Sequence, residues 1–88
     1  MLQHQFEIVN NLGLHARAAA LFVKAATPFS SDVKLGLDGI EVNGKSIMGV
    51  MMLAATKGST VQLIVDGPDE ITAMQVVGKL IQEGFGEI

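Results

Sequence analysis

Apolar and polar residues alternate in four short stretches of the chain, at residues 2–9, 33–37, 40–42 and 61–65. Alternation with a period of two is typical of a strand that buries one face. Asp38 and Gly39 separate the second and third stretches, and this pair suits the positive φ angles of a type I′ turn. The pattern therefore predicts four strands, two of which form a tight β-hairpin.

Three other segments place apolar residues at helical spacing. The first, about residues 16–26, is rich in alanine and ends before Pro28. The second covers about residues 46–55, and the third begins at residues 67–70 with proline and acidic side chains and ends near Gly84, a typical C-terminal cap. The order β-α-β-β-α-β-α predicts an α+β open-faced sandwich, with a four-stranded antiparallel sheet and three helices on one face.

Composition limits the class of protein further. With 88 residues, 49% of them hydrophobic, the chain forms one domain over residues 1–88. A net charge of −3 provides no basic face for nucleic acid. There is no cysteine, and the amino-terminal residues lack the pattern of a signal peptide or a membrane span. We therefore expect a cytoplasmic protein without membrane insertion.

One of the two histidines lies where a phosphate could be held. His15 follows the turn at residues 10–13 and directly precedes the first predicted helix. The first turn of a helix has unpaired N–H groups and a partial positive charge, and both favour phosphate. Arg17 adds a permanent cation with fork geometry, and an imidazole nitrogen can act as a nucleophile. His15 is therefore a candidate phosphoryl acceptor, whereas His4 fits a partly buried strand residue.

Composition and spacing alone favour a simpler interpretation, in which His15 caps the first turn of the helix. No second catalytic group is evident near it: the chain has no Ser-His-Asp set, no histidine pair at metal-ligand spacing and no Walker-type loop. We therefore expect no metal and no cofactor. A nucleophile without its own base indicates a carrier that depends on the active site of a partner.

Two stretches resemble the signatures of a known family. Residues 10–19 read NNLGLHARAA, which is similar to the active-centre signature of the HPr family, the histidine phosphocarriers of the bacterial phosphotransferase system. Residues 43–55 read NGKSIMGVMMLAA and resemble the family's second signature, around a regulatory serine. The spacing of the two motifs, the length and the order of elements agree as well, so the resemblance covers essentially the whole chain.

The resemblance implies roles for individual residues. His15 would accept a phosphoryl group on Nδ1 from enzyme I and pass it to enzyme IIA domains. Arg17 and the N–H groups of Ala16, Arg17 and Ala18 would stabilise the phosphoryl charge. Ala18 departs from the family, which usually has proline there, and this leaves the site less pre-organised by about 0.5–1 kcal/mol. We expect the carrier chemistry to survive with an altered rate.

Ser46 directly precedes the second predicted helix. Its spacing alone favours an N-cap hydroxyl. The resemblance adds a second role, because the matching serine of many relatives is phosphorylated by a dedicated HPr kinase/phosphorylase. A phosphate there would place about two negative charges beside a docking surface and weaken docking to acidic partners.

The second predicted helix has more apolar side chains than a sheet covered on one face can bury. Some of them should face solvent, where flexible thioethers suit several partners in turn. By resemblance, this helix and the first one form a shared docking face around His15. The expected docking residues are Lys24, Ile47, Met48, Met51 and Met52, with Lys57 and Lys45 as further cations at the rim.

Two functions remain open on the sequence. The first is a monomeric phosphocarrier, not an enzyme, of the sugar branch or the nitrogen-related (NPr) branch of the phosphotransferase system. The alternative is a small-molecule-binding regulatory module of the ferredoxin-like or ACT type. That module shares much of the element order, but it needs no histidine at the start of a helix.

Overall fold

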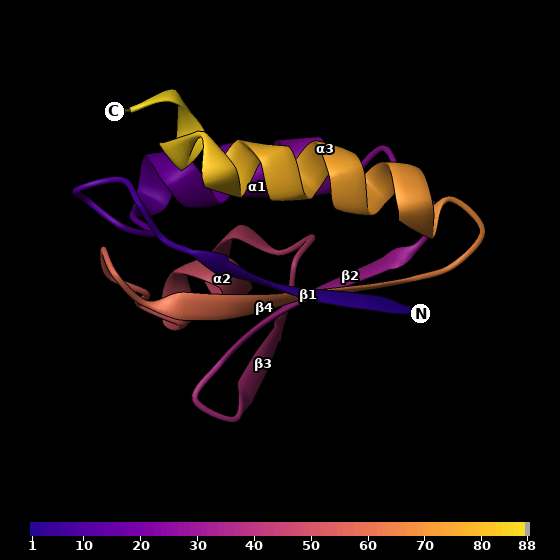
Figure 1. Cartoon of the computed structure of the whole chain (residues 1–88), viewed down its shortest axis with the longest axis horizontal. Helices are drawn as coiled ribbons and strands as arrows, with labels where there is room; N and C mark the ends of the chain where they lie inside the picture. The colour runs from indigo at the N-terminus through magenta and orange to yellow at the C-terminus, as the bar shows by residue number, and fades with distance from the viewer. Residues whose placement is uncertain (88) are drawn as a thin grey trace.

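Four strands and three helices follow one another in the predicted order. The computed structural model describes residues 1–87, and Figure 1 shows the chain from end to end. The elements are β1 (Leu2–Glu7), α1 (Ala16–Ala26), β2 (Asp32–Leu37), β3 (Ile40–Asn43), α2 (Ile47–Met52), β4 (Thr60–Asp66), α3 (Glu70–Gln82) and the 3₁₀ turn η1 (Gly84–Gly86). The predicted fold class is confirmed.

The strands form one antiparallel sheet in the order β1-β4-β2-β3. β4 lies between β1 and β2, and Leu63 of β4 pairs with Leu35 of β2. The predicted hairpin is present: Leu37 pairs with Ile40, and the two residues between them have φ angles of 52° and 83°. These are the angles that Asp-Gly was expected to supply.

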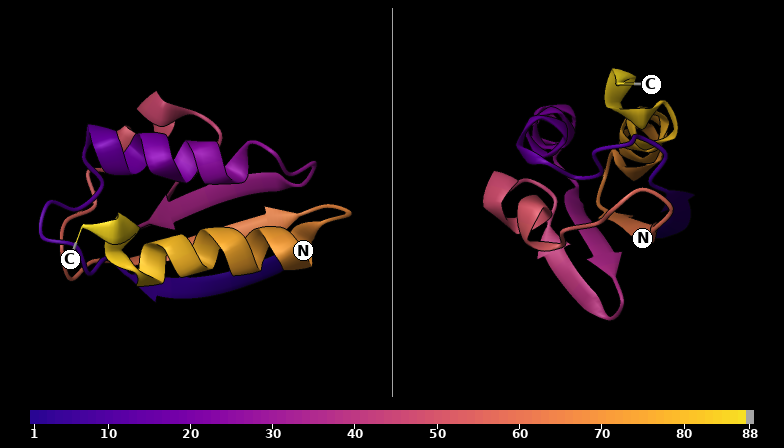
Figure 2. Two further views of the ribbon diagram at one scale, coloured as in Figure 1. Left: turned by 90° about the horizontal axis from the view of Figure 1, so that it is seen from above. Right: turned by 90° about the vertical axis from the view of Figure 1, so that its left-hand side faces the viewer.

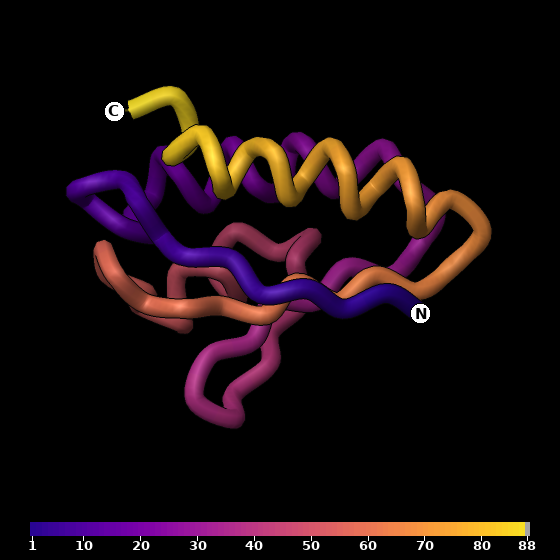
Figure 3. Tube along the Cα trace, viewed as in Figure 1, coloured from indigo at the N-terminus to yellow at the C-terminus, as the bar shows by residue number. Residues whose placement is uncertain are grey.

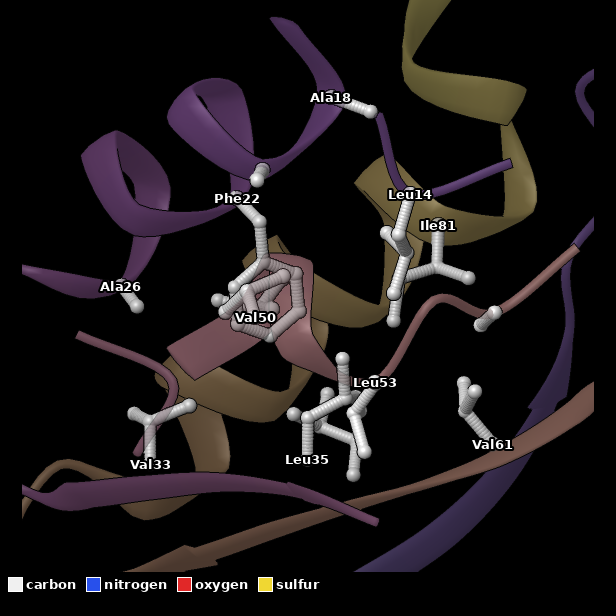
Figure 4. Packing of buried hydrophobic residues seen from close by; sticks show 14 of the residues in the cluster. Leu14, Ala18, Phe22, Ala26, Val33, Leu35, Val50, Leu53, Val61 and Ile81 are labelled. Carbon is white, nitrogen blue, oxygen red and sulfur yellow. The ribbon is translucent and has the colours of Figure 1, made fainter. Parts of the chain in front are cut away.

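The helices and the sheet enclose a single apolar core. α1 and α3 lie side by side over one face of the sheet, and α2 lies beside α1 (Figures 1 and 2). Phe22 of α1 and Val50 of α2 are fully buried and point toward Leu35 of β2 (Figure 4). In the part of the chain that the structure describes, no helix has the length and apolar content needed to cross a membrane.

α1 and α3 run in opposite directions along the sheet. The Cα trace in Figure 3 brings the end of α3 and the chain that follows it above the loop between β1 and α1, and Figure 2 agrees. The residues after α3, up to Glu87, therefore meet the start of α1, where His15 lies.

Two local predictions are corrected. α2 spans six residues and not the ten expected, because Leu53 turns into the core, Ala54 adopts a φ of 50°, and the Ala55 carbonyl accepts a hydrogen bond from the N–H of Leu14 at 2.9 Å. His4 is exposed, although a partly buried residue was expected. β1 is an edge strand, so little packs over its outer margin.

Ala54 offers a test of the backbone at the end of α2. The left-handed conformation costs a residue with a Cβ about 1–2 kcal/mol, and glycine avoids that cost while losing more entropy on folding. Ala54→Gly is therefore expected to raise the free energy of unfolding by about 0.5–1 kcal/mol, measured by urea denaturation. Ala25→Gly, inside α1, should instead lower it by a similar amount. A loss of stability in Ala54→Gly would contradict the prediction.

Candidate functional site

The loop before α1 is fixed by one backbone hydrogen bond to the rest of the domain and by one side-chain hydrogen bond within the loop. The N–H of Leu14 donates to the Ala55 carbonyl at 2.9 Å, and the Asn10 side chain donates to the Gly13 carbonyl at 2.9 Å. Gly13 has a φ of 65°, and a Cβ there would collide with the Ala55 carbonyl oxygen. Only glycine fits both the conformation and the close approach. The loop therefore presents His15 from a fixed backbone.

His15 occupies the N-cap position of α1, but its side chain forms no capping hydrogen bond. Its carbonyl accepts the first bond of the helix, from the N–H of Ala19 at 2.9 Å. The N–H groups of Ala16, Arg17 and Ala18 belong to the first turn, which has no intrahelical acceptors for them. The capping interpretation of His15 is therefore wrong, and these donors remain at the positive end of the helix.

The imidazole of His15 instead contacts a carboxylate from the end of the chain. Its Nε2 lies 2.6 Å from Oε2 of Glu87, and the two side chains are 28% and 14% exposed. The other carboxylate oxygen, Oε1, accepts a hydrogen bond from Nδ2 of Asn10 at 2.8 Å. Asn10 is fully buried. Glu87 thus joins two residues from the other end of the sequence, Asn10 and His15, in one chain of contacts.

An unusual turn brings Glu87 to this position. Gly84, Phe85 and Gly86 have φ angles of 62°, 56° and 74°, so three consecutive residues are left-handed after α3. Gly84 follows the helix as the predicted cap. Phe85 bears the cost of its positive φ because its side chain is buried in the core. The turn reverses the chain and directs Glu87 toward α1.

The environment of Glu87 favours its ionised form. Its pKa is held below the usual value, chiefly by the hydrogen bond from Asn10. The hydrogen bond with His15 and the charges of His15 and Arg17 act in the same direction, while partial burial opposes them. At neutral pH Glu87 is thus a carboxylate, which accepts hydrogen bonds and donates none.

The two other residues predicted for the first turn of α1, Arg17 and Ala18, differ in exposure. Arg17 is exposed on the first turn of α1 and forms no ion pair among residues 1–87. Ala18 is fully buried, so its methyl group belongs to the core while its N–H belongs to the first turn. Arg17 therefore keeps a free guanidinium beside His15, the arrangement expected of an anion-binding group.

Ser46 caps α2, as its spacing predicted. Its hydroxyl oxygen accepts a hydrogen bond from the N–H of Gly49 at 3.1 Å. Among the described residues no three histidine or carboxylate side chains come together as a metal site would require.

The apolar side chains of α2 divide between core and solvent. Val50 is fully buried, whereas Met48 and Met52 are 74% and 77% exposed, and Ile47 and Met51 are exposed to a lesser degree. The expectation that part of this set faces solvent is confirmed.

The three candidate rim lysines differ in their contacts. Lys24 is exposed on α1. Nζ of Lys57 donates to Oδ1 of Asn11 at 2.8 Å, and Nζ of Lys45 donates to the Phe29 carbonyl at 2.6 Å. Lys45 and Lys57 therefore also tie loops together.

Glu87 and Asn10 are the site residues that the sequence analysis missed. No second catalytic group was evident near His15 in the sequence, and the contact with Glu87 adds an acidic group that was not expected there. Spacing could not reveal the contact because 72 residues separate the two partners. The one local signal is Phe85 between Gly84 and Gly86, since glycines around an aromatic residue indicate a tight turn anchored in a core.

Known proteins are similar to this chain in both fold and sequence. The family described as "PTS HPr component phosphorylation site" matches residues 2–83. The phosphocarrier protein HPr of Cupriavidus necator is 55% identical over 87 residues, which cover 99% of this chain and 98% of that protein. A crystal structure of HPr from Thermoanaerobacter tengcongensis has a TM-score of 0.95 at 45% identity, covering 100% of this chain and 99% of that one.

Fold and sequence together define a phosphoryl carrier of the phosphotransferase system. The chain belongs to the HPr family. The ferredoxin-like or ACT-type module is not favoured, because the match to phosphocarriers extends over nearly the whole chain.

Proposed function

We propose that His15 is the residue that carries the phosphoryl group, on Nδ1. The observation that supports this most directly is the contact of Nε2 with the Glu87 carboxylate at 2.6 Å, which occupies one ring nitrogen and leaves the other. The N–H groups of Ala16, Arg17 and Ala18 would hold phosphoryl oxygens, and the exposed guanidinium of Arg17 would neutralise their charge.

In this proposal enzyme I supplies the phosphoryl group and enzyme IIA domains receive it, in the cytoplasm. The chain acts as a carrier intermediate and not as an enzyme, because both exchanges use the partner's catalytic groups. We expect it to act as a monomer, which a sedimentation measurement would test. One relative, HPr of Thermoanaerobacter tengcongensis, has a crystal structure described as a dimer, at 46% identity and a TM-score of 0.79.

The test of the carrier role is direct. Incubation with phosphoenolpyruvate and enzyme I should give one phosphoryl adduct that is labile in acid and stable in alkali, as expected for a phosphohistidine. Tandem mass spectrometry under alkaline conditions should locate it at His15. The absence of an adduct with a competent enzyme I, or an adduct elsewhere, would contradict the proposal.

The exposed side chains of α2 and the nearby lysine would form the docking surface. The proposed set is Lys24, Ile47, Met48, Met51 and Met52. Exposed thioethers offer apolar contact without a fixed shape, and this suits a carrier that meets more than one partner. Lys24 would add attraction to acidic partners.

We further propose that Ser46 is phosphorylated where an HPr kinase/phosphorylase is present. A phosphate on this N-cap would be stabilised by the start of α2 and would lie beside the exposed residues Ile47 and Met48. With ATP and a competent kinase, the wild type should form an acid-stable adduct that Ser46→Ala does not form. Ser30→Ala, a change of an exposed serine, should leave the adduct intact. If the wild type stays unmodified, the role of Ser46 is limited to capping α2.

A further inference from the structure

We propose that Glu87 is a positioning residue for phosphoryl transfer. Its carboxylate holds the proton of His15 on Nε2, and Asn10 holds the carboxylate, so the Nδ1 lone pair faces the incoming phosphoryl group. This inference rests on the proposed role of His15 and adds a residue and a tautomer to it.

The hydrogen-bond directions follow from the chemistry of the partners. Nδ2 of Asn10 faces two acceptors, the Gly13 carbonyl at 2.9 Å and Oε1 of Glu87 at 2.8 Å, so both of its hydrogens are used. Oε2 is then left for His15. Because an ionised carboxylate can only accept, Nε2 must be the donor in the contact of 2.6 Å. A neutral imidazole has one N–H, and placing it on Nε2 leaves a lone pair on Nδ1.

The contact can be kept throughout the transfer. The Nδ1 lone pair forms the new bond to phosphorus, while the bond between phosphorus and the donor breaks and its electron pair stays with the donor. The Nε2 proton is not released. The ring gains positive charge in this step, and the Glu87 carboxylate lies against the nitrogen where that charge can be shared. The reverse sequence returns the phosphoryl group to an acceptor without any change at Nε2.

The Glu87 carboxylate is fixed by buried neighbours, as expected of a group that positions another side chain. Phe85 is buried and anchors the turn that follows α3, and the hydrogen-bond donor to the carboxylate, Asn10, is fully buried. The Glu87 side chain itself is only 14% exposed. A carboxylate that orients a histidine and selects its tautomer is the arrangement by which acid groups support histidine in hydrolytic triads.

Two substitutions separate this role from a structural one. In Glu87→Gln the amide oxygen would accept from Asn10, which turns the NH₂ group toward His15. Nε2 would then have to accept, and the proton would move to Nδ1 and remove the nucleophilic lone pair. Glu87→Ala removes the partner without adding a donor. Glu83→Gln is the matched control, because Glu83 is exposed and 3.9 Å from Lys79.

The tautomer is read from the ¹⁵N chemical shifts of the His15 ring, and the rate from initial phosphorylation by enzyme I and phosphoenolpyruvate. We expect the Nε2–H form in the wild type and in Glu83→Gln, and a shift toward Nδ1–H in Glu87→Gln. The rate of Glu87→Gln should fall by at least about 10-fold, because a wrong tautomer removes the nucleophile, and that of Glu87→Ala should fall less.

Other results would overturn the inference. An unchanged tautomer and rate in Glu87→Gln, or a loss in Glu87→Ala as large as that in Glu87→Gln, would show that Glu87 does not act through the His15 proton. A faster rate in either variant would show instead that the carboxylate obstructs the phosphoryl group. The tautomer is observed without phosphorylation, so a wild type that accepts no phosphate would count against the proposed function alone.

Discussion

Substituting His15 by alanine is expected to abolish the acid-labile phosphoryl adduct completely. The imidazole is the proposed nucleophile, and neither Arg17 nor the backbone N–H groups can form a bond to phosphorus in its place. The fold should survive, because His15 is partly exposed and its side chain does not cap α1. The measurement is the phosphoryl content of the protein after incubation with enzyme I and phosphoenolpyruvate, with circular dichroism as a check on folding.

His4→Ala provides the matched control for this experiment. His4 is exposed on the edge strand β1, and its removal should leave both the adduct and the fold unchanged. Retention of an acid-labile adduct in a folded His15→Ala variant would disprove the proposed site. Loss of the adduct in His4→Ala would place the modified histidine on β1.

Gly13→Ala is expected to lower both the stability and the activity of the protein. A residue with a Cβ at a φ of 65° lowers the free energy of unfolding by about 1–2 kcal/mol. The added Cβ also collides with the Ala55 carbonyl, a backbone atom that cannot rotate away, and overpacking of this kind costs about 1–3 kcal/mol more. Relief of the collision would break the hydrogen bond from Leu14 to Ala55 and displace His15, so the rate of phosphoryl acceptance should fall as well.

Gly39→Ala isolates the two contributions to that loss. Gly39 has a φ of 83°, but nothing lies within 4 Å of a Cβ built there. The Gly39→Ala variant should therefore lose only the conformational part of the free energy of unfolding, about 1–2 kcal/mol. It should keep the full rate of phosphorylation. Urea denaturation gives the free energy of unfolding of both variants. Equal losses at the two positions would mean that the loop before α1 yields to the added methyl group without cost.

Much of the architecture could be predicted because its signals are local. Strand alternation, the helical spacing of residues 16–26 and the Asp38-Gly39 turn depend on residues a few positions apart, and the structure confirms all three. The end of α2 could not be predicted in the same way. Ala54 and Ala55 are compatible with a helix, and the chain leaves it because Ala55 pairs with Leu14, a distant residue.

In the candidate site, too, some features depend on neighbouring residues and others on contacts between distant parts of the chain. The sequence by itself determined that a histidine, an arginine and free N–H groups meet at the start of α1, because these residues are neighbours in the chain. It also carried the two motifs that identify the family. Only the tertiary structure decided that Nε2 of His15 contacts the carboxylate of Glu87. The antiparallel packing of α1 and α3 brings the end of α3 close to the start of α1, and the left-handed turn anchored by Phe85 places Glu87 against His15. Contacts across 72 residues depend on how the helices pack on the sheet, and no local pattern encodes that.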